Sequence, residues 1–248
     1  MTQEILINVT PQETRVAIVE EAAVQELHIE RTSHLGLVSN IYKGTVCRVL
    51  PGMQSAFVEI GLNRAAFLHI ADILEHGAPQ EKPIQELLRE GQSLIVQVIK
   101  DPIGSKGARL TTQISIAGRF LVYLPEQTHI GVSQRIVDET EREALRTRLT
   151  GLLPEGFSGG FIIRTLAESA TDEELKADVD YLNKAWQNVV ADGKTAEPKT
   201  LIHQDLSLPM RVLRDYVNDE IASILVDSRE TFLRMQEFAE RYASGTLA

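Results

Sequence analysis

The sequence contains one cysteine, Cys47, among its 248 residues. A single cysteine excludes an intramolecular disulfide and a zinc site built from several cysteines of one chain. This cysteine usage favours a reducing compartment, so we expect a cytoplasmic protein. No run of about 18 consecutive apolar residues is present, and the opening "MTQEILINVT" lacks a basic start and a long apolar segment. The sequence therefore predicts neither a membrane span nor a signal peptide.

Basic residues are fewer than acidic ones, 25 against 35, which gives a net charge of −10. Such a charge argues against indiscriminate binding of nucleic acid by the whole surface. The balance reverses between Arg89 and Arg119, where basic residues outnumber acidic ones. A local basic patch is therefore compatible with the acidic composition.

The pattern of short apolar runs predicts a mixed α+β protein with several domains. Hydrophobic residues make up 43% of the chain and charged residues 24%, as in ordinary globular proteins. Three alternating runs in the first 31 residues predict an antiparallel meander. Five further runs between about residues 40 and 115 predict a small barrel, interrupted by a polar excursion around Pro79 and Pro83 before the fourth strand.

The remainder mixes predicted helices and strands. Thr171 and Glu174 form a capping box that starts the clearest helix. The apolar stripe of this helix comprises Leu175, Val179, Leu182, Trp186, Val189 and Val190. The other predicted elements are strands at 119–124, 160–166, 200–204 and 221–228, helices at 138–149, from Pro209, and at 229–242, and a loop at 191–199.

The two ends of the chain each look too small to fold alone. The opening meander and the closing helix, strand and helix would complete each other as one split α/β domain. In that arrangement residues 36–204 are an insertion, and the chain start and chain end lie close together.

The stretch "QSAFVEIGLNRAAFLHI" places two phenylalanines among polar neighbours. With a period of two, Ala56, Val58 and Ile60 share one strand face, and Phe57 falls on the other face with Ser55 and Glu59. A turn centred on Leu62 puts Phe57 opposite Phe67. An aromatic pair on the second and third strands of an OB-type barrel is a platform for stacking nucleobases. The alternative is that one or both rings pack beneath the excursion around Pro79.

Two basic side chains are candidates for contacts with phosphate. In "DPIGSKGARLTT", Lys106 lies between Ser105 and Gly107 on backbone that we expect to be flexible, next to the aromatic pair. In "GGFIIRTLAESA", Arg164 and Thr165 end an apolar strand, where a guanidinium beside a hydroxyl suits a terminal phosphate. A solvated lysine and a surface ion pair are the alternatives.

The sequence contains no recognisable catalytic or metal-binding constellation. The six histidines have no paired ligand spacing, and there is no Walker loop. Asp178 and Asp180 lie on the capped helix, where we expect a solvated helix face to account for both.

Five blocks together resemble the amino-terminal half of the ribonuclease E/G family, in its ribonuclease G branch. The resemblance covers essentially the whole chain. The blocks are "NIYKGTVCRVLPGMQSAFVEIGLNRAAFLHIADI", "VQVIKDPIGSKGARLTTQISIAGRFLVYLP", "GVSQRI", "GGFIIRTLAE" and "RVLRDYVNDEIASILVDS".

The resemblance implies a split RNase H-like α/β domain, an inserted five-stranded OB-fold RNA-binding barrel and an α/β 5′-sensor region. It gives Phe57, Phe67 and Lys106 the role of holding single-stranded RNA. The implied 5′-monophosphate site comprises Arg164, Thr165, Gly118 and Val122. The implied domains are 1–35 and 205–248 for the RNase H-like parts, 36–118 for the barrel and 119–204 for the sensor.

Family members are implied to be endoribonucleases of RNA processing and mRNA decay that hydrolyse RNA with magnesium and join protomers through a zinc link. The catalytic aspartates and the cysteine motif of the family would follow Ala248, and Cys47 in a barrel strand does not match that motif. We therefore expect this chain to bind no magnesium or zinc and not to cleave RNA by itself.

The expected partner is single-stranded RNA, preferably with a 5′ monophosphate, and the expected state is a monomer or weak dimer without membrane contact. A free-standing RNA-binding protein of translation or decay is the alternative. A third hypothesis treats Phe57 and Phe67 as a protein-contact patch.

Overall fold

The computed structural model describes residues 3–33, 35–73, 82–217 and 220–242. The chain divides into two compact units, residues 1–36 with 206–248 and residues 37–205. Part of the excursion predicted around Pro79 lies outside the described residues. Within the described ranges, no helix is both long enough and apolar enough to cross a membrane.

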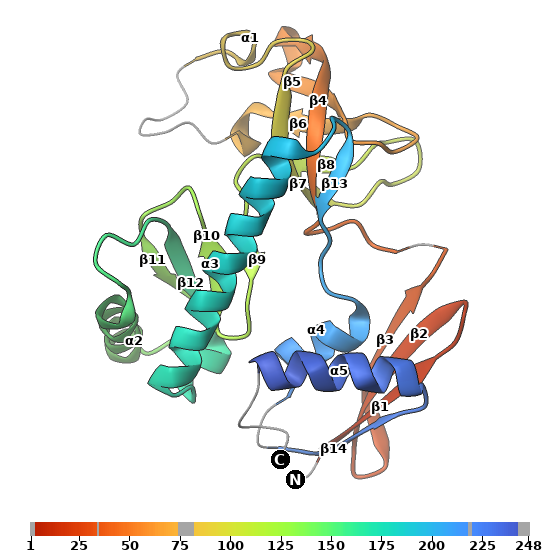
Figure 1. Cartoon of the computed structure of the whole chain (residues 1–248), viewed down its shortest axis with the longest axis vertical. Helices are drawn as coiled ribbons and strands as arrows, with labels where there is room; N and C mark the ends of the chain where they lie inside the picture. Colours follow the sequence, from red (N-terminus) through yellow and green to blue (C-terminus); the bar gives the residue numbers. More distant parts are fainter. Residues whose placement is uncertain (1–2, 34, 74–81, 218–219, 243–248) are drawn as a thin grey trace. The chain divides into compact units, whose positions relative to one another are not determined.

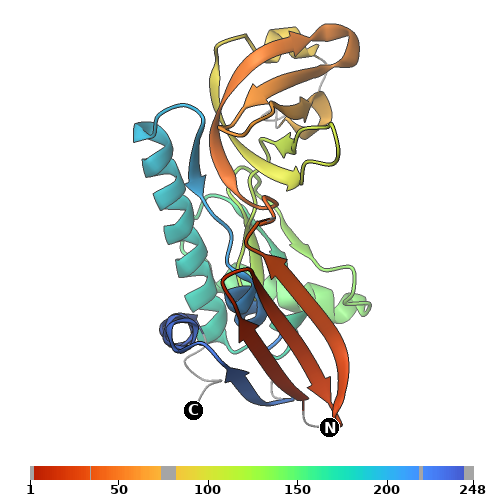
Figure 2. The same cartoon turned by 90° about the vertical axis from the view of Figure 1, so that its right-hand side faces the viewer.

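The first unit is built on a four-stranded sheet that joins the two ends of the chain. The predicted meander is present as β1 (Gln3–Val9), β2 (Glu13–Glu20) and β3 (Ala23–Arg31). Strand β14 (Ile221–Val226) pairs parallel to β1, so the sheet order is β14-β1-β2-β3 (Figures 1 and 2). The predicted proximity of chain start and chain end is confirmed, while an RNase H-like identity stays a prediction.

One face of this sheet is covered by helices α4 (Leu208–Asp215) and α5 (Arg229–Tyr242). The alternation along β1 explains which face, because Ile5 and Ile7 point into the core while Leu6 is exposed on the other side. The buried members of this core are Ile5, Ile7, Val16, Leu208, Val212, Leu213, Val217 and Met235.

The second unit contains the predicted barrel of five strands. These are β4 (Ile41–Leu50), β5 (Ser55–Glu59), β6 (Ala66–His69), β7 (Ser93–Lys100) and β8 (Arg109–Thr111). They follow the order β4-β5-β6-β8-β7, and β4 also pairs with β7, which closes the barrel. Strands β6 and β8 run parallel. The closed five-stranded barrel is consistent with an OB fold.

The first barrel strand bends at a glycine. Residues before Gly44 pair with β13 (Thr200–His203), and residues after it pair with β5. A side chain at Gly44 would bring its Cβ to 2.5 Å from Val58 Cγ1. The glycine therefore allows β4 to lie close to β5 in a barrel of small radius.

The rest of the second unit is a smaller sheet packed against two helices. The sheet order is β11-β12-β10-β9. Its elements are β9 (Ile116–Ala117), β10 (Leu121–Leu124), β11 (Ile130–Val132), α2 (Glu139–Leu152), β12 (Gly160–Ile163), the short 3-10 turn η3 (Thr165–Glu168) and α3 (Asp172–Thr195). The predicted strand at 119–124 and the predicted helix at 138–149 are confirmed as β10 and α2, and the Thr171–Glu174 capping box is present. The predicted strand at 160–166 ends at Ile163, because η3 begins at Thr165, so Arg164 and Thr165 follow the strand and do not end it.

The prediction of a loop from residue 191 to 199 is wrong for its first part, because α3 continues to Thr195. The sequence pair Asp192–Gly193 resembles a helix end, but Gly193 is buried against the barrel. An added Cβ at Gly193 would lie 2.7 Å from Ile95 Cδ1. The helix therefore continues because its last turn packs on β7, and Lys43 Nζ then donates to Ala196 O at 2.8 Å.

Candidate nucleic-acid interface

Phe57 and Phe67 lie directly opposite each other on β5 and β6. Their ring centroids are 6.2 Å apart and the rings are inclined at 66°, an edge-to-face arrangement. Both rings are half-buried, whereas Ala56 and Val58 on the other face are fully buried. The predicted pairing is confirmed. Ser55 was expected on the polar face, but it is buried and its Oγ donates to Met53 O at 2.8 Å.

Two arginines extend the aromatic pair across the barrel. Arg48 is paired in register with Phe57, and Arg109 with Phe67. The side chain of Arg48 is exposed, and that of Arg109 forms an ion pair with Asp72 at 2.9 Å. We name Arg48, Phe57, Phe67 and Arg109 the barrel row. It combines rings that can stack with cations that can contact phosphate.

The sequence pattern did not reveal Arg48. The register of β4 against β5 shifts between Val46 and Arg48, so Cys47 is the extra residue of a β-bulge. Cys47 Sγ donates to Phe57 O at 3.3 Å. A bulge breaks the period-two alternation, and no glycine or proline in "TVCRVL" marks it.

His69 adds a third ring next to Phe67, with centroids 6.5 Å apart and an interplanar angle of 31°. Its Nδ1 accepts a hydrogen bond from the Ala71 N–H at 3.1 Å. The neutral ring therefore carries its proton on Nε2, which can donate to a ligand.

Lys106 is held by a tight hairpin and not by the flexible loop that the sequence predicted. Ile103 and Lys106 exchange two backbone hydrogen bonds of 3.2 and 3.0 Å, and Gly104 adopts a φ of +57°. The next residue, Gly107, lies against β6, because an added Cβ would meet Ala65 O at 2.0 Å. The exposed Lys106 is thereby held close to the start of the strand that carries Phe67.

A second group of residues surrounds the turn from Gly118 to Leu121. Arg164 Nη1 donates to Gly118 O at 2.7 Å, and the Arg164 N–H donates to Phe120 O at 2.8 Å. Thr165 is half-buried at the start of η3. Val122 is half-buried on β10 and pairs with Ala117 and Ile162. The structure therefore gathers Gly118, Val122, Arg164 and Thr165 around one turn.

Asp178 is buried beneath the same turn, so its assignment to a solvated helix face is wrong. Its side chain is only 6% exposed, while Asp180 is exposed as expected. The Asp178 carboxylate accepts the N–H groups of Arg119, Phe120 and Leu121 at 3.1, 2.9 and 2.9 Å. These bonds replace water, and without them a buried carboxylate would be costly.

Burial raises the pKa of the Asp178 carboxyl, while the three N–H groups and then the charge of Arg164 act to lower it. The sequence does contain a signal for this burial. Asp178 follows Leu175 by three residues and precedes Leu182 by four, which places it within the buried stripe of α3.

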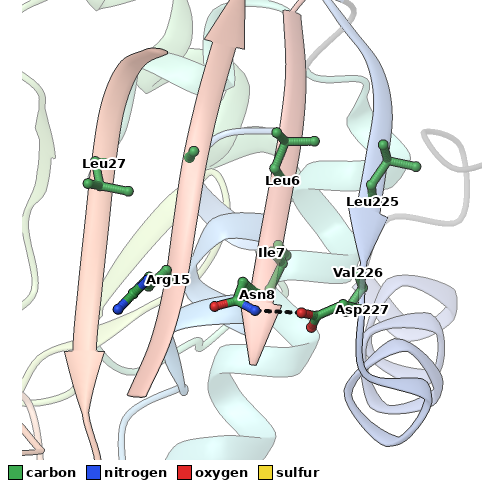
Figure 3. Close-up of a pocket in the computed structure, with 9 residues that line it drawn as sticks. Leu6, Ile7, Asn8, Arg15, Leu27, Leu225, Val226 and Asp227 are labelled. Atoms are coloured by element: carbon green, nitrogen blue, oxygen red, sulfur yellow. Dashed lines mark hydrogen bonds between the residues drawn. The ribbon is translucent and has the colours of Figure 1, made fainter. Parts of the chain in front are cut away.

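A pocket of about 520 Å³ lies on the exposed face of the sheet in the first unit (Figure 3). Leu6, Leu27 and Leu225 give it an apolar floor, and Asn8 Nδ2 donates to Asp227 Oδ2 at 2.6 Å at one end. None of the predicted site residues lines this pocket. Across the described ranges, no three His, Cys, Asp or Glu side chains are grouped so that they could hold a metal ion.

Comparison with known proteins identifies the family. The model of the Ribonuclease E/G family matches residues 115–247. Ribonuclease G of Escherichia coli (strain K12) is 49% identical to this chain, and the match covers 98% of this chain and 51% of the relative. Ribonuclease G of Haemophilus influenzae is 47% identical, and the match covers 96% of this chain and 50% of the relative. Ribonuclease E of E. coli is 37% identical over 91% of this chain and 22% of its own length. The chain spans about half the length of these ribonuclease G relatives, and it belongs to the ribonuclease E/G family.

Proposed function

We propose that this chain is the RNA-binding and 5′-end-sensing part of a single-strand-specific endoribonuclease that acts in RNA processing and mRNA decay. The barrel holds single-stranded RNA, and the turn around Gly118 holds a 5′ monophosphate. The observation that carries the proposal is the barrel row, in which two facing rings lie between two arginines.

The barrel row suits single-stranded RNA because its rings can stack on bases of any sequence. Stacking contributes about 1–3 kcal/mol per base in comparable sites. The exposed Arg48, in register with Phe57, and the exposed, hairpin-held Lys106 would contact backbone phosphates next to the rings. Because the whole chain carries a charge of −10, we expect these local cations to confine RNA to this face.

The proposed 5′-phosphate site depends on the orientation of Arg164. Its guanidinium is anchored through Nη1 to Gly118 O, and Thr165 supplies a hydroxyl at the next residue. A planar guanidinium recognises two phosphate oxygens at once, which a flexible lysine does less well. Gly118 and Val122 would line the site.

In this proposal the RNase H-like parts, 1–35 and 205–248, support the barrel domain 36–118 and the sensor domain 119–204. Magnesium-assisted hydrolysis and a zinc link between protomers are proposed for the full-length protein. For this chain we propose RNA binding and no cleavage step.

Fluorescence anisotropy with one short RNA, prepared with a 5′ monophosphate or a 5′ hydroxyl, tests both sites. We expect tighter binding of the phosphorylated RNA by the unaltered chain. Phe57→Ala should lower the affinity for both RNAs by about tenfold, which corresponds to the loss of one stacked base. Arg164→Ala should remove the preference for phosphate and leave binding of the hydroxyl RNA unchanged.

Two control variants carry substitutions on the surface of the first unit, which contains none of the proposed site residues. Phe232→Ala removes a 50% exposed aromatic ring from α5, and Arg234→Ala removes an exposed arginine from the same helix. Neither should change the affinity. Equal binding of the two RNAs by the unaltered chain would contradict the 5′-sensor assignment, and unchanged binding in Phe57→Ala would contradict the stacking platform and favour a protein-contact patch.

A further inference from the structure

We propose that Asp178 is the positioning residue for Arg164, acting through three aligned peptide groups that lie between the two side chains. The inference rests on the proposed 5′-phosphate site. It assigns to a buried helix residue the task of fixing the guanidinium before RNA arrives.

Each of the three peptide groups from Gly118 to Leu121 contacts both Asp178 and Arg164. Their N–H groups, from Arg119, Phe120 and Leu121, all donate to the Asp178 carboxylate at 2.9–3.1 Å. Their carbonyls, from Gly118, Arg119 and Phe120, accept from Arg164. Its Nη1 contributes bonds of 2.7 and 3.4 Å to the first two, and its backbone N–H contributes a 2.8 Å bond to the third.

This arrangement orients three peptide dipoles in the same sense. In a trans peptide the N–H and C=O bonds point in opposite directions, and each unit has a dipole of about 3.5 D. The positive ends of all three meet the negative carboxylate of Asp178. The negative ends of the first two meet the positive guanidinium of Arg164, and the third meets the Arg164 backbone N–H. Each charge therefore stabilises the peptide orientation that favours the other.

The packing at Gly118 supports a dedicated contact. An added Cβ at Gly118 would lie 2.4 Å from Asp178 Oδ1, so the carboxylate occupies the space that a side chain would need. Asp178 comes from α3, whose neighbouring buried residues Leu175, Val179 and Leu182 fix the helix against the small sheet. The carboxylate is thus held rigidly beneath the turn.

The consequence for RNA recognition is a preformed site. A free arginine side chain loses rotamer freedom when it is ordered, and this loss opposes binding. Because Arg164 is already anchored to the turn, this loss of freedom does not reduce the affinity for phosphate. If Asp178 loses its charge, the three peptide N–H groups lose their charged common acceptor and the anchor of Arg164 weakens.

Asp178→Asn tests this role, with Asp180→Asn on the exposed face of α3 as the matched control. The Asn variant keeps the shape of the side chain and removes the charge and one acceptor oxygen. With the two RNAs described above, we expect Asp178→Asn to reduce the preference for the 5′ monophosphate at least several-fold. Binding of the 5′-hydroxyl RNA should stay within twofold, a result that general loss of structure would not give. Asp180→Asn should change neither affinity.

A preference for phosphate that persists in folded Asp178→Asn would overturn the inference and leave the proposed 5′-sensor function intact. Absence of a preference in the unaltered chain would instead reject the sensor function itself. If Asp178→Asn does not fold, hydrogen exchange of the unaltered chain decides. Slow exchange of the amides at residues 119–121 without RNA supports a preformed turn, and exchange as fast as in an unstructured peptide overturns it.

Discussion

Single residues in this chain take their roles from the groups that surround them more than from their type. Asp178 and Asp180 are two positions apart on one helix, yet the first is buried beneath a turn and the second is exposed. Phe57 and Phe67 share a face with polar neighbours but are half-buried, and their rings meet in an edge-to-face arrangement. Such a pair is partly ordered in the free protein, which would lower the entropic cost of stacking on a base in the proposed RNA site.

Gly118→Ala tests the close contact between the turn and Asp178. The added Cβ would lie 2.4 Å from Asp178 Oδ1, so the carboxylate or the turn must move. We expect the free energy of unfolding to fall by about 1–3 kcal/mol, as for other overpacked sites. The preference for a 5′ monophosphate should fall with it. Urea denaturation and RNA anisotropy measure the two effects.

Gly151→Ala is the control, since a Cβ at Gly151 in α2 meets nothing within 4 Å. This substitution should be neutral or stabilise the protein, because alanine favours a helix over glycine by about 1 kcal/mol. Equal stability of Gly118→Ala and the unaltered chain would contradict the close contact between the turn and Asp178.

At the scale of elements, α3 connects the parts of the second unit. Its capping box fixes the start, its stripe packs on the small sheet, and its last turn packs on barrel strand β7 through Gly193. The carboxylate of Asp178 lies on the same helix. A change in the position of α3 is therefore expected to reach both proposed RNA sites.

Thr171→Ala removes the side chain that starts α3. Thr171 Oγ1 accepts the Glu174 N–H at 3.2 Å, and the Glu174 carboxylate accepts the Thr171 N–H at 2.8 Å. Loss of such a cap costs about 0.5–2 kcal/mol. We expect a decrease of about 1 kcal/mol in the free energy of unfolding, measured by urea denaturation. Thr195→Ala, at the other end of the helix, should have a smaller effect; an equal effect would contradict the importance of the cap.

At the scale of the whole molecule, each unit has its own core, and the first unit depends on residues from both chain ends. Ile5 and Ile7 from the start pack with Leu213 and Met235 from the end. Asp227 ties the two segments at the surface, since its carboxylate accepts the Val9 N–H at 2.8 Å and the Asn8 side chain at 2.6 Å. Loss of either end should therefore unfold this unit.

Asp227→Asn should destabilise the first unit in a pH-dependent manner. The Val9 N–H and then Asn8 hold the pKa of Asp227 below its ordinary value of 3.8. The folded state therefore favours the ionised carboxylate, and this stabilisation is present above pH 4 or so and lost as pH falls through the lowered pKa. Because the site is exposed, we expect an effect below about 1 kcal/mol at neutral pH.

Urea unfolding of the unaltered chain and of Asp227→Asn between pH 2 and 7 measures the difference in their free energies of unfolding. Hydrogen exchange of the amides in β1 and β14 reports on the first unit. The two stabilities should converge in acid. A difference that stays constant across the range would assign the effect to packing and not to the charge of Asp227.

The sequence by itself determined most of the elements and the faces of the strands around the aromatic pair. Features that depend on residues close together in the sequence can be recognised from their spacing. They include the alternation around Phe57 and Phe67, the Thr171–Glu174 capping box and the five barrel strands. The same local patterns, together with the family resemblance, indicated Lys106 and Arg164 as candidates.

Only the tertiary structure decided which distant groups meet. The bulge at Cys47 brought Arg48 into the barrel row, the approach of Gly193 to Ile95 prolonged α3, and the packing of α3 placed Asp178 beneath the turn that anchors Arg164. These outcomes depend on contacts between residues far apart in the chain. Their energies arise only when the elements pack. A local pattern such as the helical spacing of Asp178 can indicate that a residue is buried, but it does not specify which distant groups the residue meets.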